Sequence, residues 1–296
     1  MDKALPLVSI IMATYNRAQT IKRAIDSVLN QTYRNFELII IDDGSTDNTS
    51  QVLKEYNDPR IRIYVLNVNK GVTAAKNSGL KQIKGEWFGT FDSDDELVPN
   101  AIETLMNVPL NLDNNVTSLL GNGKDFSSGA LTGTGLTKDG YINGNEILSF
   151  VDGDFWGLIK TSLLQNDLFN ENVHGCESIL WYKINSRANK YYVHQVLDII
   201  HTEGEDRVSR TKFNLRKREI HYKNLIEEEF FLDVTARYRP LEFYNICRGG
   251  ILIMNASGRR DLATKYYQLF VKYSKRNLVI ELLYRFWIFS LILRVY

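Results

Sequence analysis

Short runs of β-branched and aromatic residues alternate with amphipathic segments along the first hundred residues of the chain. The runs that predict β-strands, each bounded by residues that favour turns, are 8–12, 36–41, 61–65 and 87–91. Apolar residues at helical spacing predict helices over 21–29, around Val52 and Leu53, and over 72–83. Because strands that alternate with helices indicate βαβ units, the sequence predicts an α/β fold with a mainly parallel sheet flanked by helices.

The pattern is less regular beyond residue 100. Residues 110–141 are rich in Gly, Asn, Ser and Thr and predict loops and irregular strands, whereas residues 154–184 mix helical signals with a loop. Residues 191–200 predict one more strand, and the final part of the chain shows helical spacing to its end. We therefore expect an α/β domain over residues 1–211 and a helical C-terminal extension over residues 212–296.

Polar clusters follow three of the four N-terminal strands. They are Thr14-Tyr15-Asn16, Asp42-Asp43 and Asp92 to Asp95. Ligands of parallel α/β sheets bind beyond the carboxyl ends of the strands. We therefore expect these side chains to share one crevice and to carry the chemistry of the protein.

Each of these clusters has two interpretations when it is taken alone. Asp92 and Asp94 would bind Mg²⁺ or Mn²⁺ through hard oxygen ligands, or they would only bond to their own backbone in a turn. Asp42 and Asp43 would accept hydrogen bonds from a base or ribose, or they would cap the next helix. Lys70 lies in a turn before a predicted helix, where backbone N–H groups either favour phosphate or serve only as a cap.

Composition narrows the class of protein without choosing a function. The 296 residues carry 36 Lys+Arg against 35 Asp+Glu, a formal net charge of +1, so the strong basic excess typical of nucleic-acid binding is missing. With 44% hydrophobic and 24% charged residues, the chain can bury a sizeable core. Cys176 and Cys247 are too few for a disulfide framework or a thiolate zinc site, and we expect a reducing, cytoplasmic location.

The order of these features resembles the family 2 glycosyltransferases of the GT-A fold. The matching stretches are VSIIMATYNR, FELIIIDDGSTDNT, NKGVTAAKNSG and WFGTFDSDDELVP. The resemblance is specific over roughly residues 6–100 and weaker to about residue 210. It implies a Rossmann-like GT-A domain with a nucleotide-binding half over residues 1–100 and an acceptor-binding half over residues 101–211.

The resemblance assigns roles to residues at the three strand ends. Those implied to bind a nucleotide sugar are Ala13, Tyr15, Asp42, Asp43, Lys70, Lys76, Asp92 and Asp95. Among these, Asp43 would accept a hydrogen bond from a uracil-like ring N–H group, and Asp95 would orient the sugar. The implied ligands of Mn²⁺ or Mg²⁺ are Asp94, Asp92 and His201, with Asp94 the direct ligand in the family's Asp-x-Asp motif.

An inverting transfer also needs a base that takes the proton of the attacking hydroxyl group. The family offers a Glu-Asp pair before an aromatic-rich helix, and alignment on Trp181 places Glu177 at the Asp position, with Cys176 in place of the Glu. The resemblance thus implies Glu177 as the base; otherwise Glu177 is a helix-start acid that satisfies the helix dipole. Trp156 resembles an acceptor-side aromatic that stacks on a sugar, or it belongs to the core.

The last apolar segment, residues 278–296, follows a group of basic residues. These are Lys265, Lys272, Lys275 and Arg276. Glu281, Arg285 and Arg294 interrupt the segment and argue against a spanning helix. Basic residues beside an aromatic apolar helix favour docking on an anionic membrane surface, here the inner face of the cell membrane. The alternative is a helix that packs on the α/β domain or on a second copy in a homodimer.

The sequence therefore predicts an inverting, metal-dependent glycosyltransferase. It would move a sugar from a nucleotide sugar, with UDP-sugars favoured, to a glycan or lipid-linked acceptor in the synthesis of polysaccharide or cell-surface glycan. A sugar nucleotidyltransferase is one alternative, although the turn after the first strand lacks the Gly-rich phosphate loop of that class. A non-catalytic scaffold of glycan assembly is another, and the departure at Cys176 favours it.

Overall fold

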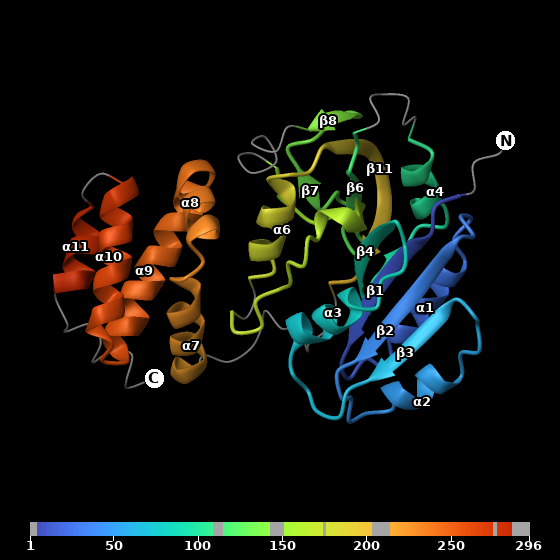
Figure 1. Cartoon of the computed structure of the whole chain (residues 1–296), viewed down its shortest axis with the longest axis horizontal. Helices are drawn as coiled ribbons and strands as arrows, with labels where there is room; N and C mark the ends of the chain where they lie inside the picture. Colours follow the sequence, from blue (N-terminus) through green and yellow to red (C-terminus); the bar gives the residue numbers. More distant parts are fainter. Residues whose placement is uncertain are drawn as a thin grey trace. The chain divides into compact units, whose positions relative to one another are not determined.

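The computed structural model describes residues 5–108, 115–142, 151–173, 176–202, 214–274 and 277–285. The chain divides into two compact units (Figure 1). The sheet unit comprises Met1–Phe169 and Ile184–Glu205, and the helical unit comprises Asn170–Lys183 and Asp206–Tyr296. The predicted domain boundary after residue 211 lies outside the described residues.

Among the described residues, nine strands of the sheet unit form one mixed sheet (Figure 1). The strand order is β3-β2-β1-β4-β10-β6-β11-β5, and β8 pairs with β11. The N-terminal strands are β1 (Val8–Thr14), β2 (Phe36–Asp42), β3 (Ile61–Val65) and β4 (Trp87–Asp92). These four strands pair with one another in parallel, as the alternation of strands and helices predicts. Burial along the whole of β2 accounts for its continuous apolar run.

The second half of the sheet differs from the prediction. Its strands are β5 (Glu96–Leu97), β6 (Ser118–Asp125), β8 (Gly140–Ile142), β10 (Phe155–Lys160) and β11 (Lys190–Ile200), while β7 (Gly133–Thr134) and β9 (Asp152–Gly153) form a separate ribbon. Strand β10 runs antiparallel between β4 and β6, although residues 154–184 predict helical signals. It is a strand because burial alternates along it, with Trp156 and Leu158 buried.

Glycines explain why the sequence pattern did not reveal β6 and β10 clearly. A Cβ atom at Gly157 would lie 2.2 Å from the carbonyl oxygen of Leu119, and one at Gly121 would lie 2.5 Å from Cδ1 of Leu197. The backbone of the neighbouring strand therefore excludes a side chain at Gly157, and the buried side chain of Leu197 occupies the position at Gly121. Without these side chains, the alternation that marks a strand is interrupted.

Helices α1 (Ile21–Leu29), α2 (Thr49–Lys54) and α3 (Val72–Leu80) lie where the sequence predicts them, whereas helix α4 (Ala101–Met106) and the short 3₁₀ turn η1 (Thr161–Leu163) were not predicted. These are the described helices that belong wholly to the sheet unit. Helix α1 buries an apolar stripe that includes Ile21 and Ile25. Helix α3 lies close to β1, because a Cβ atom at Gly79 would approach Cγ2 of Ile11 to 2.4 Å.

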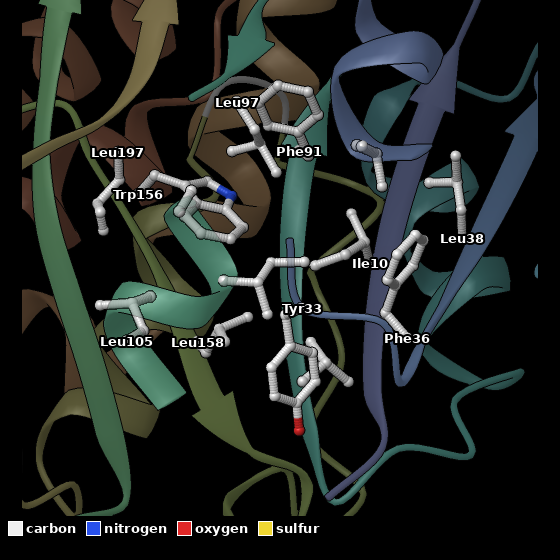
Figure 2. Packing of buried hydrophobic residues seen from close by; sticks show 14 of the residues in the cluster. Ile10, Tyr33, Phe36, Leu38, Phe91, Leu97, Leu105, Trp156, Leu158 and Leu197 are labelled. Atoms are coloured by element: carbon white, nitrogen blue, oxygen red, sulfur yellow. The ribbon is translucent and has the colours of Figure 1, made fainter. Parts of the chain in front are cut away.

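One hydrophobic core joins the two halves of the sheet (Figure 2). It includes Ile10 of β1 and Leu38 of β2 together with Leu158 of β10 and Leu197 of β11. Such a close-packed interior resists deformation, so the strands hold their relative register. The core therefore fixes the positions of the strand ends.

The described C-terminal residues form helices, as the sequence predicts. These helices are α7 (Leu215–Leu225), α8 (Glu229–Tyr238), α9 (Pro240–Ala256), α10 (Arg260–Tyr273) and α11 (Leu278–Arg285), while α6 (Ser178–Asn185) begins in the helical unit and ends in the sheet unit. Helices α9 and α10 pack closely, since a Cβ atom at Gly250 would lie 2.5 Å from the ring of Tyr266. Across the part of the chain that the structure describes, each helix is too short or too polar to cross a membrane.

Burial of the charged side chain of Lys190, at the start of β11, should lower the free energy of unfolding. Its side chain is 5% exposed, its Nζ donates to Oγ of Ser118 at 3.3 Å, and burial lowers its pKa to about 8. Holding this ammonium group at pH 7 costs about 3 kcal/mol relative to the unfolded chain. Because the unfolded chain binds the proton more tightly, this cost should disappear as the pH rises from about 8 to about 10.5.

We therefore expect Lys190→Met to raise the melting temperature at pH 7 and to lose this advantage at pH 10. Lys124→Met, which changes an exposed lysine of β6, is the control and should leave the melting temperature unchanged at both pH values. Thermal unfolding followed by circular dichroism measures both. An advantage of Lys190→Met that is equal at pH 7 and pH 10 would show that the buried charge is not its cause.

Candidate active site

The polar clusters at the ends of β1, β2 and β4 share one edge of the sheet. In the parallel register, Thr14 lies opposite Asp42, and Ala13 lies opposite Asp92. The carboxyl ends of β1, β2 and β4 therefore present Thr-Tyr-Asn, Asp-Asp and Asp-x-Asp side by side. The clusters therefore lie along one edge of the sheet, with half-buried Ala13 at its centre, and their sharing of one crevice stays a prediction.

Asn16 fixes the turn after β1. Its backbone has a φ of 52°, a left-handed conformation that Asn adopts more readily than most residues. Its side-chain Oδ1 accepts N–H groups of Thr46 at 2.8 Å and Asp47 at 3.4 Å, and its own N–H donates to Oγ of Ser45 at 2.9 Å. The turn after β1 is thereby tied to the turn after β2. Beside it Tyr15 is 38% exposed and available to a ligand.

Asp42 and Asp43 have different positions. Asp42 is fully buried, and its oxygens accept from the N–H of Ser45 at 2.9 Å and from the hydroxyl of Ser50 at 2.8 Å. This corrects the prediction that Asp42 contacts the nucleotide, because its carboxylate instead braces the turn that follows β2. The alternative that Asp42 caps the next helix does not hold either, because the N-cap residue of α2 is Asn48.

Asp43 holds a second turn in place. Its oxygens accept the backbone N–H groups of Lys70 at 2.9 Å and Gly71 at 2.7 Å, and Gly71 has a φ of 95° that a side chain would strain. Burial raises the pKa of Asp43, and these two hydrogen bonds oppose that rise. A carboxylate has about four lone-pair positions, so two remain for another donor. Recognition of a base by Asp43 stays a prediction.

Cations lie beside both carboxylates of the Asp-x-Asp motif. Nζ of Lys76, whose side chain is 6% exposed, lies 3.4 Å from Oδ1 of Asp92, while Lys70 is exposed. Nε of Arg17 lies 3.5 Å from Oδ2 of Asp94. Of the two predicted lysines, the structure therefore brings Lys76 to the acidic edge. The sequence analysis did not identify Arg17 as a site residue, although its position directly after the Thr-Tyr-Asn cluster could have indicated it.

His201 is engaged by residues of the same edge. Its N–H donates to Oδ1 of Asp95 at 2.8 Å, and its Nε2 lies 2.7 Å from Oε1 of Glu96. Its ring stacks on Phe126 at a centroid distance of 4.4 Å, and its side chain is 9% exposed. These contacts restrain Asp95 and His201 together. Metal binding by His201 stays a prediction.

Asp198 is a carboxyl group that sequence reasoning missed. It lies on β11, is 7% exposed, and its Oδ1 has no hydrogen-bond partner within the described residues. Burial, followed by the charges of Asp95, Asp154 and Asp92, raises its pKa to about 8. The sequence feature that could have identified it is an aspartate inside the apolar run Val196-Leu197-Asp198-Ile199-Ile200, because acidic residues are seldom fully buried unless they are paired.

Trp156 belongs to the core, which corrects the prediction that it stacks on an acceptor sugar. Its side chain is 5% exposed and its Nε1 donates to the carbonyl oxygen of Thr90 at 3.1 Å. Its ring meets Phe91 edge to face at a centroid distance of 6.4 Å (Figure 2). Since the indole is buried among these neighbours, neither of its faces is available to a sugar.

Glu177 lies in the helical unit, at the start of α6. Its carbonyl oxygen accepts the N–H of Leu180 at 3.1 Å, and its side chain is half-buried. Burial raises the pKa of the neighbouring Cys176 thiol to about 11, so this thiol is neutral at physiological pH. Cys176 therefore supplies no second charge where the family has a Glu. The role of Glu177 as base stays a prediction.

Comparison with known proteins identifies the family. Residues 9–183 match the family described as Glycosyl transferase family 2. The GalNAc(5)-diNAcBac-PP-undecaprenol beta-1,3-glucosyltransferase of Campylobacter jejuni is 31% identical over 248 residues, which cover 79% of each chain. WfgD of Escherichia coli, a UDP-Glc:alpha-D-GlcNAc-diphosphoundecaprenol beta-1,3-glucosyltransferase, is 39% identical over 178 residues that cover 60% of this chain and 69% of WfgD. The chain belongs to glycosyltransferase family 2 and is a glycosyltransferase.

Solved structures agree on the fold. Staphylococcus aureus TarS 1-349, in complex with UDP-GlcNAc, matches with a TM-score of 0.61 at 18% identity over 94% of this chain and 78% of that chain. The mannosyltransferase PcManGT from Pyrobaculum calidifontis, in complex with GDP-Man and Mn2+, matches with a TM-score of 0.51 at 17% identity over 98% of this chain and 81% of that chain. The sheet and its helices have the predicted GT-A fold.

The hydrogen bonds by which Asn16 ties the turn after β1 to the turn after β2 can be tested directly. Asn16→Ala removes its side-chain hydrogen bonds and places alanine at positive φ, so the free energy of unfolding should fall by about 1–3 kcal/mol. UDP should also bind more weakly, because the turn that carries Tyr15 loses its support. Urea denaturation and calorimetry measure the two effects. Asn16→Gly tolerates the positive φ but lacks the amide, so it should recover only the part of the lost free energy of unfolding that is due to backbone strain. Wild-type stability of Asn16→Ala would show that the Asn16 side chain does not support the turn.

Proposed function

We propose that this glycosyltransferase moves a sugar from a UDP-sugar, with inversion, to a glycan or lipid-linked acceptor in cell-surface glycan synthesis. The proposal rests above all on the convergence of Tyr15, Lys76, Asp92 and Asp94 at one edge of the sheet. The two curated relatives named above, whose names specify undecaprenol-linked substrates, support the acceptor class. The TarS complex with UDP-GlcNAc supports the donor class.

A divalent cation, Mn²⁺ or Mg²⁺, fits the chemistry of this edge. The side chains of Asp92 and Asp94 are 61% and 32% exposed, and carboxylate oxygens are the hard ligands that these ions prefer. Within the described residues no three His, Cys, Asp or Glu side chains converge to hold a metal ion. We therefore infer a site with these two protein ligands, to which diphosphate and water add oxygens. Once bound, the ion would stabilise the negative charge of the departing diphosphate.

The residues of the chain supply the rest of the chemistry. Lys76 and Arg17, each beside a carboxylate of the motif, would attract the diphosphate and stabilise its charge as the sugar–phosphate bond breaks. Asp43 and Tyr15 would hold the base. Glu177 would take the proton from the acceptor hydroxyl as that oxygen attacks the anomeric carbon. Attack from the face opposite the leaving group inverts the anomeric configuration.

Two substitutions separate binding from transfer. Asp94→Asn should weaken Mn²⁺-dependent binding of UDP by roughly tenfold or more, because a charged ligand of the ion is lost. Glu177→Gln should leave that binding intact and slow transfer by roughly 10²–10⁴-fold, because the base is lost. Calorimetry with UDP and Mn²⁺ measures the first effect. Release of UDP from UDP-Glc or UDP-GlcNAc measures the second.

Glu103→Gln on α4, whose carboxylate accepts from the hydroxyl of Thr32, is the matched control and should behave as wild type in both assays. Metal dependence unchanged by Asp94→Asn would remove the metal assignment. Full activity of Glu177→Gln would move the base elsewhere. A wild-type chain that binds UDP and transfers no sugar would favour the non-catalytic scaffold.

We further propose that the helical unit docks peripherally on the cytoplasmic face of the cell membrane, where lipid-linked acceptors lie. On α11, Val279 is 49% and Leu282 is 40% exposed, which gives this helix an apolar face open to a partner. The basic side chains of Lys265 and Lys272 on α10 suit an anionic surface. The predicted tail beyond residue 285 lies outside the described residues.

Vesicle sedimentation tests the docking proposal. The chain should bind vesicles that contain anionic phospholipid, and Val279→Asp combined with Leu282→Asp should reduce binding by roughly tenfold or more, because buried apolar area is replaced by charge. Leu241→Asp, on α9 at a position that is 73% exposed, is the control. Vesicle binding by the α11 variant that equals wild-type binding would refute the proposal. If the wild-type chain is dimeric and the α11 variant is monomeric, α11 serves a homodimer instead.

A further inference from the structure

Asp198 lies where the sheet meets the acidic edge. On β11 it pairs with Leu97 of β5 on one side and with Gly123 of β6 on the other. The register of β11 against β6 is irregular between Val196 and Asp198, which interrupts the alternation of side chains, and the Asp198 carboxyl lies on the face toward which Gly123 would point a Cβ atom. This face also carries Thr132, whose hydroxyl donates to the carbonyl oxygen of Asp154 at 2.9 Å.

The Asp198 carboxyl group is buried without a full set of partners. The residue is 7% exposed, and Oδ1 has no hydrogen-bond partner within the part of the chain that the structure describes. Leaving a buried polar oxygen unpaired destabilises a fold, and folded proteins seldom retain one without compensation. A bound ligand that donates a hydrogen bond to this oxygen would supply that compensation.

The absence of a side chain at Gly123 lets the Asp198 carboxyl lie close to β6. A Cβ atom there would lie 2.9 Å from Oδ1 of Asp198 and 2.5 Å from Oγ1 of Thr132. Glycine therefore leaves the carboxyl and the hydroxyl next to one another on the same face. Together they offer a hydrogen-bonding pair of the kind that fits a hydroxyl-bearing ligand.

The surrounding charges select the class of ligand. Asp95, Asp154 and Asp92 lie close enough to act on the charge of Asp198, so the group faces other carboxylates and would repel an anion. Neutral hydroxyl groups, which donate hydrogen bonds to carboxyl oxygens, fit these conditions.

We propose that Asp198 binds a hydroxyl group of a sugar at the transfer site and thereby contributes to sugar specificity. The inference rests on the proposed function, because it needs a nucleotide sugar or a glycan acceptor at the acidic edge. Its proximity to Asp95, predicted to orient the donor sugar, favours a sugar rather than the nucleotide as the ligand. The contact would add discrimination beyond the diphosphate and base contacts.

The test uses the full chain and compares affinities for UDP, a UDP-sugar and the acceptor. Asp198→Leu keeps the approximate volume and removes the hydrogen bond, so affinity for one sugar substrate should fall roughly tenfold to hundredfold while affinity for UDP is unchanged. A loss specific to the UDP-sugar assigns the contact to the donor, and a rise in the acceptor KM assigns it to the acceptor. Asp198→Asn, which retains a side-chain oxygen, should recover most of the lost affinity.

Two further variants guard against a merely structural effect. Gly123→Ala leaves the Asp198 carboxyl in place but crowds it, so it should reproduce the loss even if Asp198→Leu fails to fold. Tyr192→Phe removes the hydroxyl of another buried residue of β11, which bonds to Nδ1 of His194 at 2.9 Å, and should leave the sugar affinities unchanged. Parallel loss of UDP affinity in Asp198→Leu, or wild-type sugar affinity in both Asp198→Leu and Gly123→Ala, would overturn the inference. A wild-type chain that binds UDP-sugars no better than a protein without the fold would instead refute the proposed function.

Discussion

The parallel register between β1, β2 and β4 is the constraint on which the active site depends. These strands are buried, and their register aligns Thr14 with Asp42 and Ala13 with Asp92. A one-residue slip would turn every core side chain toward the wrong face, so packing of the apolar residues specifies where the polar ends lie. The hydrophobic core and the chemistry of the site are thus consequences of the same alignment.

Acidic groups at this edge are restrained in different ways. Asp42 and Asp43 accept from the chain's own donors and fix two turns, so their negative charge is used to build the site. Beside Lys76 and Arg17, the side chain of Asp92 is exposed and that of Asp94 is half-buried. Asp198 is buried, and its Oδ1 has no hydrogen-bond partner among the described residues. Asp42 thus supports only the structure, whereas Asp43 supports a turn and keeps acceptor positions for another donor.

How much the sequence predicts depends on how each element is stabilised. The N-terminal strands were predictable because each is a run of β-branched or aromatic residues, and three of the four end in a polar cluster. Strands β6 and β10 were not, since contacts such as that of Gly157 with Leu119 demand glycine and interrupt the alternation of side chains. Trp156 was ambiguous because an indole can face a sugar or a core, and only the tertiary contacts decide.

The candidate site shows the same division. The position of Asp92 and Asp94 followed from local sequence, whereas the contact of Arg17 with Asp94 joins residues far apart in the chain. Asp198 was hidden within an apolar strand, and only its burial and its acidic neighbours distinguish it. Local patterns thus located the edge, and tertiary contacts determined which side chains it uses.

Anomalous diffraction from crystals of the full chain grown with UDP and Mn²⁺ tests the central claim most directly. The account predicts a manganese peak bound by Asp94 and by diphosphate oxygens, with the uracil at the carboxyl ends of β1 and β2 beside Tyr15 and Asp43. A nucleotide bound away from these strand ends, or manganese held by other side chains, would contradict it.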